Sequence, residues 1–183
     1  MVKYSEVTPY TQMENFFNKC DNPYWKHIAK GLYYTGARAG ELIQIKKNDI
    51  QQDKDNPNFI NIMIHTEKNP HAPIRYVPII KNKEPLAVSE FISESEGLLF
   101  PPYKERIKIN SYLRVMRKKF NDYWGIAPHY FRHCRLTHMV TEFDFNDQEL
   151  VKYAGWTDST PAKWYMSLKV TDLQRKMEFK ILR

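Results

Sequence analysis

The stretch FINIMIHTEKNPHAPIRYVPII, residues 59–80, is the part of the sequence in which the hydrophobic pattern changes from a helical period to an extended one. Isoleucine occupies every second position from Ile60 to Ile64, which predicts a strand over 59–65. The segment IRYVPII, residues 74–80, predicts a second strand. The connection TEKNPHAP between them contains two prolines and an asparagine, which are typical of turns. The stretch therefore predicts an antiparallel β-hairpin.

On both sides of this hairpin the sequence predicts helices. Thr8 followed by Pro9 has the pattern of an N-cap and a first helical position. An Asn-Pro pair ending at Pro23 repeats this signal for a helix that stops at Gly36, and the helical pattern continues over 39–45. Later helices are expected over 83–94, 104–123, 128–142, 147–154, 159–168 and 171–181. The predicted fold class is therefore mostly α with a small antiparallel β-sheet (α+β).

The composition of the chain is that of one globular domain. Of its 183 residues, 42% are hydrophobic and 27% are charged, and the length is short for two domains. No stretch approaches the roughly 18 uninterrupted apolar residues that a membrane span needs, and the N-terminus has no apolar signal segment. Cys20 and Cys134 are too few for a disulfide framework, which favours a reducing intracellular compartment. We therefore expect a single domain over residues 1–183.

An excess of basic residues favours a polyanionic partner, most simply nucleic acid. The formal net charge is +7 and the isoelectric point is about 9.3. Part of the excess lies in KERIKINSYLRVMRKKF, residues 104–120, in which Glu105 is the single acidic residue. A solvated helix face is the other interpretation of this segment. The residues that we expect to contact the DNA backbone are Arg106, Lys108, Arg114, Arg117 and Lys118.

The stretch PHYFRHCRLTH, residues 128–138, is dense in residues that bind either metal ions or phosphate. His129 and His133 are one helical turn apart, a spacing that suits zinc ligands. His129 and Arg132 are also one turn apart, and this pair suits a phosphate. The stretch lacks the glutamate of the zinc-protease helix, and no second group of ligands occurs elsewhere at a recognisable spacing. Phosphate binding is therefore favoured, and His133 is expected to form a structural hydrogen bond among the helices.

Four separated pieces of the sequence carry residues that suit a phosphodiester. They are Arg38 and Glu41 in YYTGARAGELIQI (33–45), Lys68 in the hairpin connection, His129 and Arg132 in HYFR, and Trp156 and Tyr165 in YAGWTDSTPAKWY (153–165). In this order and at these separations, the pieces resemble the catalytic domain of the tyrosine recombinases, also called phage-type integrases. The pattern of that family is a TGxRxxEL segment, a hairpin lysine, an HxxR helix, a Gly-His or Gly-Trp pair, and a nucleophilic tyrosine nine residues later. The resemblance spans residues 7–168, and the YAGW and RHCRLTH forms look most like integrases of archaea and their viruses.

The resemblance implies the DNA breaking-rejoining fold and a role for each motif residue. Arg38 and Arg132 would hold the non-bridging oxygens of the scissile phosphate with forked, permanently charged donors. Tyr165 would attack the phosphorus, which forms a 3′-phosphotyrosine and releases a 5′-hydroxyl. His129 would accept the phenol proton, and Lys68 would protonate the departing 5′-oxygen.

Two further motif residues would support this chemistry. Trp156 lies where many family members have histidine, and its indole N–H can donate a hydrogen bond to a phosphate oxygen but cannot transfer a proton. Glu41 would support the two arginines from behind. The resemblance also implies no metal ion and no other cofactor, and the sequence contains neither a P-loop nor an acidic cluster of the kind that magnesium requires.

Some of these assignments leave alternatives open. Lys68 precedes Arg75 by seven residues, which makes the hairpin connection longer than is usual in the family. Lys54 is therefore an alternative for the catalytic lysine, as is a purely solvated role for Lys68. Plain packing or capping roles are the alternatives for Arg38, Trp156 and Tyr165.

The expected function is site-specific DNA recombination, in which an integrase cleaves and rejoins DNA through a 3′-phosphotyrosyl intermediate without ATP. The alternatives are DNA relaxation of the type IB topoisomerase kind and a non-catalytic DNA-binding module of the same fold. The implied partners are double-stranded DNA attachment sites and further copies of the protein, as a tetramer on DNA for the full-length protein and a monomer for an isolated domain. No membrane partner is expected. We expect the N-terminal core-binding domain of the family to be absent from this chain, and the location to be the cytoplasm, at the nucleoid or in the host of a virus.

Overall fold

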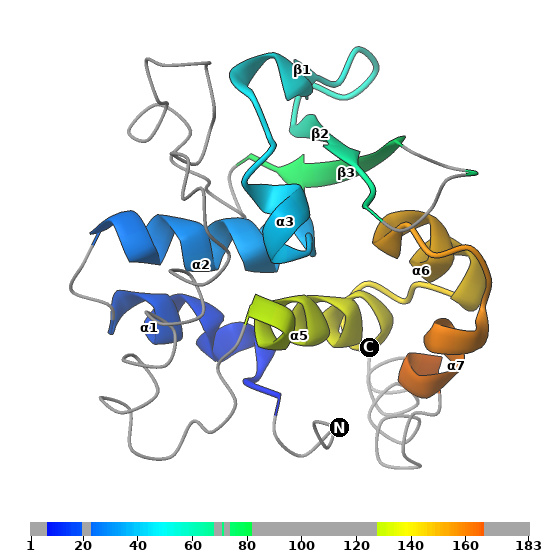
Figure 1. Cartoon of the computed structure of the whole chain (residues 1–183). Coiled ribbons are helices and arrows are strands. Elements are labelled where there is room, and N and C mark those ends of the chain that lie inside the picture. Colours follow the sequence, from blue (N-terminus) through cyan, green and yellow to red (C-terminus); the bar gives the residue numbers. More distant parts are fainter. Residues whose placement is uncertain (1–6, 20–22, 68–70, 72–73, 82–127, 167–183) are drawn as a thin grey trace.

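The computed structural model describes residues 7–19, 23–67, 71, 74–81 and 128–166 of the chain (Figure 1). Helices dominate this part and the strands form one antiparallel sheet, so the predicted fold class is confirmed. The helices expected over 83–94, 104–123 and 171–181 lie outside the described residues. The helical elements are η2 (Tyr10–Gln12), α1 (Met13–Asn18), α2 (Pro23–Thr35), α3 (Ala39–Leu42), η3 (Lys47–Asp49), α5 (Pro128–Thr141), α6 (Asp147–Ala154) and α7 (Thr160–Met166), and the strands are β1 (Ile50–Gln52), β2 (Phe59–His65) and β3 (Ile74–Ile80). In the described part of the chain, no helix has the length and apolar character needed to cross a membrane.

Three antiparallel strands form the sheet, in the order β1–β2–β3. Both predicted strands have the expected bounds, and they pair from Phe59 with Ile80 to His65 with Ile74. The hydrophobic pattern does not predict β1, because its three residues IQQ are mostly polar and exposed and show no alternation. This short strand pairs with β2 at the edge of the sheet, where its other side needs no partner strand.

One face of β3 is buried and the other is exposed. Val77 and Ile79 are fully buried, whereas Ile74 and Tyr76 are 42% and 54% exposed. This alternation follows from the two-residue period of a strand. The same period places Arg75 on the buried face, where only 5% of its surface is exposed. An arginine therefore occupies a position that this strand otherwise gives to apolar side chains.

The main core lies between α2 and α5, which Figure 1 shows side by side, with α1 next to them. Leu32 and Tyr33 of α2 and Phe131 and Leu136 of α5 are each at most 1% exposed. Phe17 of α1 stacks on Phe131, with ring centroids 6.2 Å apart. Burial of each such side chain contributes about 1.5–3 kcal/mol. This packing holds α5 in place against the C-terminal end of α2.

Arg135 of α5 is a buried cation among aromatic rings. It is 1% exposed, and its Cζ atom lies 5.5 Å from the ring of Tyr33 and 5.9 Å from that of Tyr153. Its Nε donates a hydrogen bond to the Tyr153 hydroxyl at 2.9 Å, and that hydroxyl donates to the backbone carbonyl of Tyr34. Aromatic faces attract a cation, so these contacts offset part of the cost of burying the charge. They also tie α6 to α2 and α5.

The first helical turn differs from the prediction. Pro9 has an extended backbone with ψ of 143°, and the helical residues begin after it, at Tyr10. Thr8 does not cap the helix, because its hydroxyl forms a hydrogen bond of 2.7 Å with the hydroxyl of Tyr130. The predicted N-cap is therefore wrong: a tertiary contact uses the side chain that a local cap would have needed.

The helix predicted over 39–45 is also shorter in the structure, because α3 ends at Leu42. The chain then turns so that Ile45 enters the core, where it is 2% exposed. Asp49 accepts a hydrogen bond of 2.8 Å from the backbone N–H of Lys46, which closes the 3-10 turn η3. This turn directs the chain into β1.

Candidate active site

Arg38 lies immediately after the glycine turn that ends α2. Gly36 has a φ of +57°, and the residue before α3 is Arg38 with an extended backbone. Its Nη1 donates to Oε1 of Glu41 at 2.6 Å, and its backbone N–H donates to Oε2 of the same carboxylate at 2.9 Å. The Arg38 side chain is 20% exposed. It is therefore held from behind and still reachable from solvent.

Glu41 is a buried carboxylate at the centre of three guanidinium groups. Besides Arg38, it contacts Nη2 of Arg75 at 2.9 Å and Nη1 of Arg132 at 3.9 Å. Burial by itself would raise the pKa of Glu41, but Arg75, the Arg38 backbone N–H and Arg132 outweigh it and hold that pKa below its usual value. One negative charge thus faces three positive charges, which leaves a local positive surplus suited to an anionic ligand.

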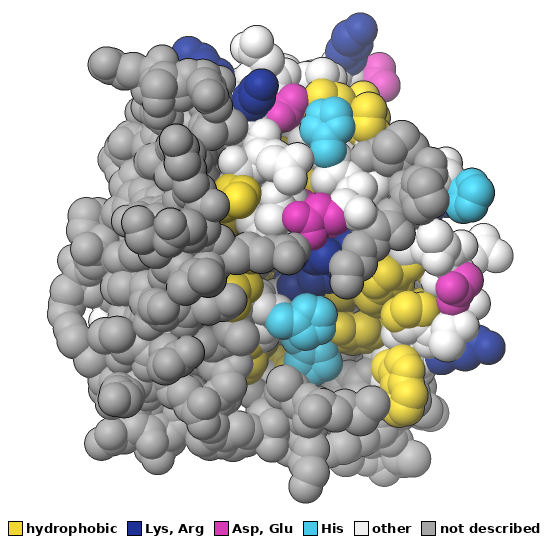
Figure 2. Space-filling view, in the orientation of Figure 1, with side chains coloured by type: hydrophobic (Ala, Val, Ile, Leu, Met, Phe, Trp, Pro, Cys, Tyr) yellow, Lys and Arg dark blue, Asp and Glu magenta, His cyan; other side chains and the backbone are white. Residues whose placement is uncertain are grey.

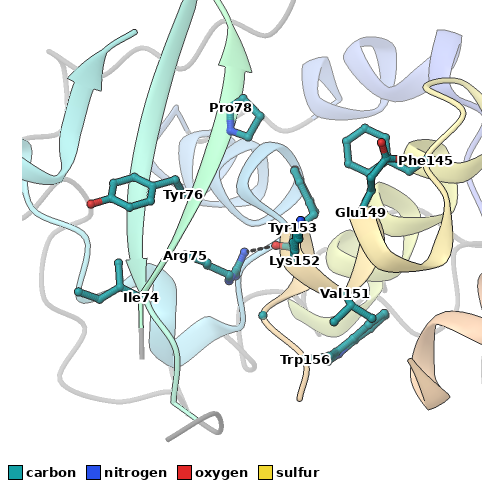
Figure 3. A pocket seen from close by; sticks show the side chains of 11 residues that line it. Ile74, Arg75, Tyr76, Pro78, Phe145, Glu149, Val151, Lys152, Tyr153 and Trp156 are labelled. Carbon is teal, nitrogen blue, oxygen red and sulfur yellow. Dashed lines mark hydrogen bonds between the residues drawn. The ribbon is translucent and has the colours of Figure 1, made fainter. Parts of the chain in front are cut away.

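Arg75 connects the hairpin to the end of α6. Its Nη1 donates to the carbonyl of Tyr153 at 2.7 Å, and Figure 3 shows this bond in a groove of about 520 Å³ between β3 and α6. Gly155 follows with a φ of +67°, and a Cβ atom there would lie 2.8 Å from Cδ of Arg75 and 2.6 Å from Cγ2 of Thr66. Glycine is required at this position because the backbone is left-handed and the space is already filled. Trp156 comes next in the chain and lines the same groove as Arg75.

Arg132 of α5 is anchored by two backbone carbonyls. Its Nη1 donates to Gly36 at 2.5 Å and its Nη2 donates to Ala154 at 2.7 Å. These carbonyls lie at the C-terminal ends of α2 and α6, where helix dipoles favour a cation. Burial and the charges of Arg75 and Arg38 lower the pKa of Arg132 to about 9, so the group remains protonated at neutral pH.

His129 lies on the first turn of α5 with its side chain exposed. Partial burial, together with the charges of Arg132 and Arg38, lowers the pKa of His129. Its imidazole forms no hydrogen bond with any of the described residues. Figure 2 shows His (cyan), Lys or Arg (dark blue) and Asp or Glu (magenta) side chains following one another in the middle of this face. The neutral imidazole of His129 thus lies near Arg132 and Arg38 and is accessible to a ligand.

Tyr165 of α7 is 8% exposed and packs against two other rings. Its ring stacks on that of Trp156, with centroids 5.8 Å apart and planes at 29°. Its hydroxyl oxygen lies 3.1 Å from Nδ1 of His133. Trp156 also faces Arg132, whose Cζ atom lies 5.8 Å from the indole ring. Trp156 therefore lies between the ring of Tyr165 and the guanidinium of Arg132.

The sequence matches one protein family over most of its length. The sequence model of the phage integrase family covers residues 6–171. This chain belongs to the phage integrase family. A search of curated protein sequences gives no significant match.

Solved structures of phage integrase relatives have the same fold. XerH site-specific recombinase bound to difH substrate, in a pre-cleavage complex, superposes with a TM-score of 0.71 and 15% identity, over 97% of this chain and 55% of that chain. XerA recombinase has a TM-score of 0.71 and 17% identity, over 95% and 64% of the two chains. The Tn1549 transposon integrase in complex with transposon right end DNA has a TM-score of 0.62 and 18% identity, over 100% and 68%. This family member thus spans between about half and two thirds of the length of the proteins it resembles.

The structure brings together most of the motif residues that the sequence singled out in this chain. Arg38 and Arg132 both contact Glu41, and Trp156 lies between Arg132 and Tyr165. Lys54, the alternative lysine, is exposed in the connection between β1 and β2. The predicted residues that lie outside the described part of the chain are Lys68, Arg106, Lys108, Arg114, Arg117 and Lys118. Among the described residues, no group of three or more His, Cys, Asp or Glu side chains is arranged to hold a metal ion.

Two residues of the candidate site were not assigned to it from the sequence. The family pattern gives no role to Arg75, but its position on the same strand face as the apolar Val77 and Ile79 indicates a buried arginine. His133 was expected to form a hydrogen bond among the helices, and it does so, but its partner is Tyr165 of α7, the expected nucleophile. No local pattern connects His133 with Tyr165, because the two residues lie on different helices and are 32 positions apart.

Proposed function

We propose that the chain is the catalytic part of a site-specific DNA recombinase that cleaves and rejoins DNA through a 3′-phosphotyrosyl intermediate. The observation that carries the proposal is the position of Tyr165, which stacks on Trp156 next to the guanidinium of Arg132. A hydroxyl nucleophile beside surplus positive charge is what attack on a phosphodiester requires. Family membership supports the proposal, as do the DNA complexes of XerH and the Tn1549 integrase. In the proposal, further copies of the protein complete the assembly on the DNA.

Arg38 and Arg132 would bind the non-bridging oxygens of the scissile phosphate. The two backbone carbonyls use two of the five N–H donors of Arg132, which leaves donors for a phosphate. Arg38 is 20% exposed and bonds Glu41 through Nη1, so its remaining N–H groups are available to DNA. Glu41 and Arg75 would act by keeping both guanidinium groups in position. Because the donors are fixed before DNA binds, little reorganisation is needed as charge develops on the phosphate.

Tyr165 would attack the phosphorus in line with the departing 5′-oxygen. The new bond joins the phenol oxygen to phosphorus, and the bond from phosphorus to the 5′-oxygen breaks with its electron pair. An imidazole of α5 would accept the phenol proton, and Lys68 would donate a proton to the 5′-oxygen. The reverse attack by a 5′-hydroxyl rejoins the strand. The phosphotyrosine linkage conserves the bond energy, so ligation needs no ATP.

Trp156 would order the site in this reaction. Its indole N–H is a donor only and cannot transfer protons, so it would hydrogen-bond a phosphate oxygen. Its stacking on Tyr165 limits the rotation of the phenol ring, and its contact with Arg132 fixes the distance between nucleophile and cation. Pre-positioning of this kind reduces the entropy lost on reaching the transition state.

The test is covalent trapping on a pool of nicked DNA duplexes with randomised sequence around the nick. The nick lets the short fragment with the new 5′-hydroxyl diffuse away, so the protein–DNA adduct accumulates. With EDTA present, the wild type should form an adduct and Tyr165→Phe should not. Tyr76→Phe is the matched control, because Tyr76 is 54% exposed on the outer face of the sheet and should keep full activity.

Three results would contradict parts of the proposal. No adduct from the wild type would contradict the recombinase chemistry. An adduct from Tyr165→Phe would show that another residue is the nucleophile. Captured DNA without any common sequence would favour relaxation of the type IB topoisomerase kind over site-specific recombination.

A further inference from the structure

The hydroxyl of Tyr165 is in hydrogen-bond contact with a histidine outside the HxxR pair. His133 follows Arg132 on α5, and its Nδ1 lies 3.1 Å from the Tyr165 oxygen. The two rings pack at a centroid distance of 5.3 Å with an interplanar angle of 51°. The Tyr165 ring therefore contacts both His133 and Trp156. The Tyr165 oxygen therefore faces an imidazole, a group that can gain or lose a proton.

The two histidines of this helix differ in what they can do. A proton acceptor must lie within about 2.6–3.2 Å of the atom that gives up the proton, and His133 meets this requirement. His129, four residues earlier and on the first turn of α5, has an exposed side chain and does not contact Tyr165 in the described part of the chain. Its surroundings instead include Arg38 and Arg132, the residues proposed to bind the phosphate. His129 is thus placed on the phosphate side and His133 on the nucleophile side.

We infer that His133 is a catalytic residue that accepts the proton of Tyr165 at Nδ1 during DNA cleavage, an inference that rests on the proposed function. As the Tyr165 oxygen forms its bond to phosphorus, its proton moves to Nδ1, and the neutral imidazole becomes an imidazolium. At the same time the 5′-oxygen leaves phosphorus with the bonding electron pair and takes a proton from the acid of the site. In ligation the same imidazolium returns the proton to the tyrosine oxygen as the phosphotyrosine bond breaks.

The assignment also defines the tautomer of His133. A neutral imidazole has one N–H donor and one acceptor nitrogen. For Nδ1 to accept from the Tyr165 hydroxyl, the proton of the resting imidazole must be on Nε2. The hydrogen bond then holds the phenol in the protein's own active site before DNA arrives, which favours cleavage by the tyrosine of the same copy.

The first test compares His133→Asn with His133→Leu in single-turnover adduct formation. Asparagine carries its amide at the δ position, so it keeps a hydrogen-bonding atom near the place of Nδ1 but cannot take up a proton. If His133 accepts the proton, both variants should slow cleavage by about 10²–10⁴-fold. If His133→Asn cleaves within about threefold of wild type while His133→Leu is slow, the residue only positions Tyr165 and the inference is overturned. Thermal unfolding of both variants checks that the fold is intact.

A second test uses DNA with sulfur in place of the bridging 5′-oxygen. A thiolate leaves without protonation because its pKa is far below that of an alcohol, so this substrate removes the need for an acid. The defect of His133→Asn should persist with this substrate, because its cause is the missing proton acceptor for Tyr165. Recovery to the wild-type rate would mean that His133 serves the leaving group, and it would overturn the inference.

A third measurement needs no DNA and separates the inference from the proposed function. Nitrogen-15 spectra of the histidine-labelled protein should show that Tyr165→Phe shifts the Nδ1 signal of His133, assigned by its loss in His133→Asn. An unchanged Nδ1 signal would show that His133 and Tyr165 are not in contact, and it would overturn the inference even in an active enzyme. A shifted signal in a protein that forms no adduct would contradict the proposed function, and with it the proton transfer, while the contact itself stands.

Discussion

Nη2 of Arg75 lies 2.9 Å from Oε2 of Glu41, in an ion pair whose side chains are 4% and 0% exposed. This pair joins β3 to α3, and Nη1 of Arg75 extends the link to the carbonyl of Tyr153 in α6. Glu41 in turn holds Arg38. Arg75 and Glu41 together therefore link three elements that are distant in the sequence. We expect both the stability of the domain and the geometry of the candidate site to depend on this pair.

Replacing Arg75 by Met should lower the free energy of unfolding by about 3–5 kcal/mol, because it removes one partner of a buried ion pair. Urea denaturation measures this change. Tyr76→Ser is the matched control, since Tyr76 is the next residue of β3 but is 54% exposed, and it should change stability by only about 0.5 kcal/mol. Equal effects of the two substitutions would show that the ion pair contributes nothing specific.

The pH dependence of stability should carry a contribution from Glu41. Burial opposes its charge, but Arg75, the Arg38 N–H and Arg132 lower its pKa, so the folded state binds the proton more weakly than the unfolded state. This stabilisation is fully present above the ordinary pKa of glutamate and is lost as the pH falls through the lower, folded value. Urea midpoints between pH 7 and pH 3 should fall less steeply for Glu41→Gln than for wild type. Parallel curves would contradict the prediction.

Gly155→Ala should be more damaging than Gly36→Ala. Both glycines have positive φ, so each substitution carries the cost of a left-handed L-residue, about 1–2 kcal/mol. At Gly155 the new Cβ would also lie 2.6 Å and 2.8 Å from Thr66 and Arg75, whereas at Gly36 the nearest atom is 3.1 Å away. The difference between their unfolding free energies isolates the steric part. A larger loss for Gly36→Ala would argue against the close packing of Arg75 under Gly155.

Arg38→Ala should slow adduct formation by about 10²–10³-fold, as does the loss of a single donor to a developing oxyanion. Arg38→Lys should restore only part of the rate, because lysine keeps the charge but not the forked pair of donors. Single-turnover trapping on the captured DNA site measures both. Arg38 is partly exposed, so its loss should leave the fold intact. A near-normal rate for Arg38→Ala would show that Arg38 does not bind the phosphate.

Lys68→Ala should be slow on normal DNA and recover on DNA with a bridging 5′ sulfur, because a thiolate leaving group needs no acid. Lys54→Ala, in the exposed connection between β1 and β2, should behave like wild type on both substrates. The opposite pattern, with Lys54→Ala slow and rescued by sulfur, would assign the acid to Lys54.

Local patterns predicted the parts of the fold that local forces decide. The two-residue alternation of isoleucine gave the bounds of β2, and the capping residues Asn146 and Gly155 mark the observed ends of α6. The pattern failed where a tertiary contact competes with a local one. Thr8 bonds Tyr130 instead of capping a helix, and the short edge strand β1 exists only because β2 offers a partner.

The order of the elements, the family and the residue types that suit a phosphodiester all follow from the sequence, because periodicity and motif separations are properties of the chain alone. Two contacts became visible in the folded protein alone: the ion pair of Arg75 with Glu41, and the contact of His133, rather than His129, with the Tyr165 hydroxyl. These contacts join residues 34 and 32 positions apart on different elements. Their formation depends on how α5 packs against α7 and how β3 lies over α3, which no local period encodes.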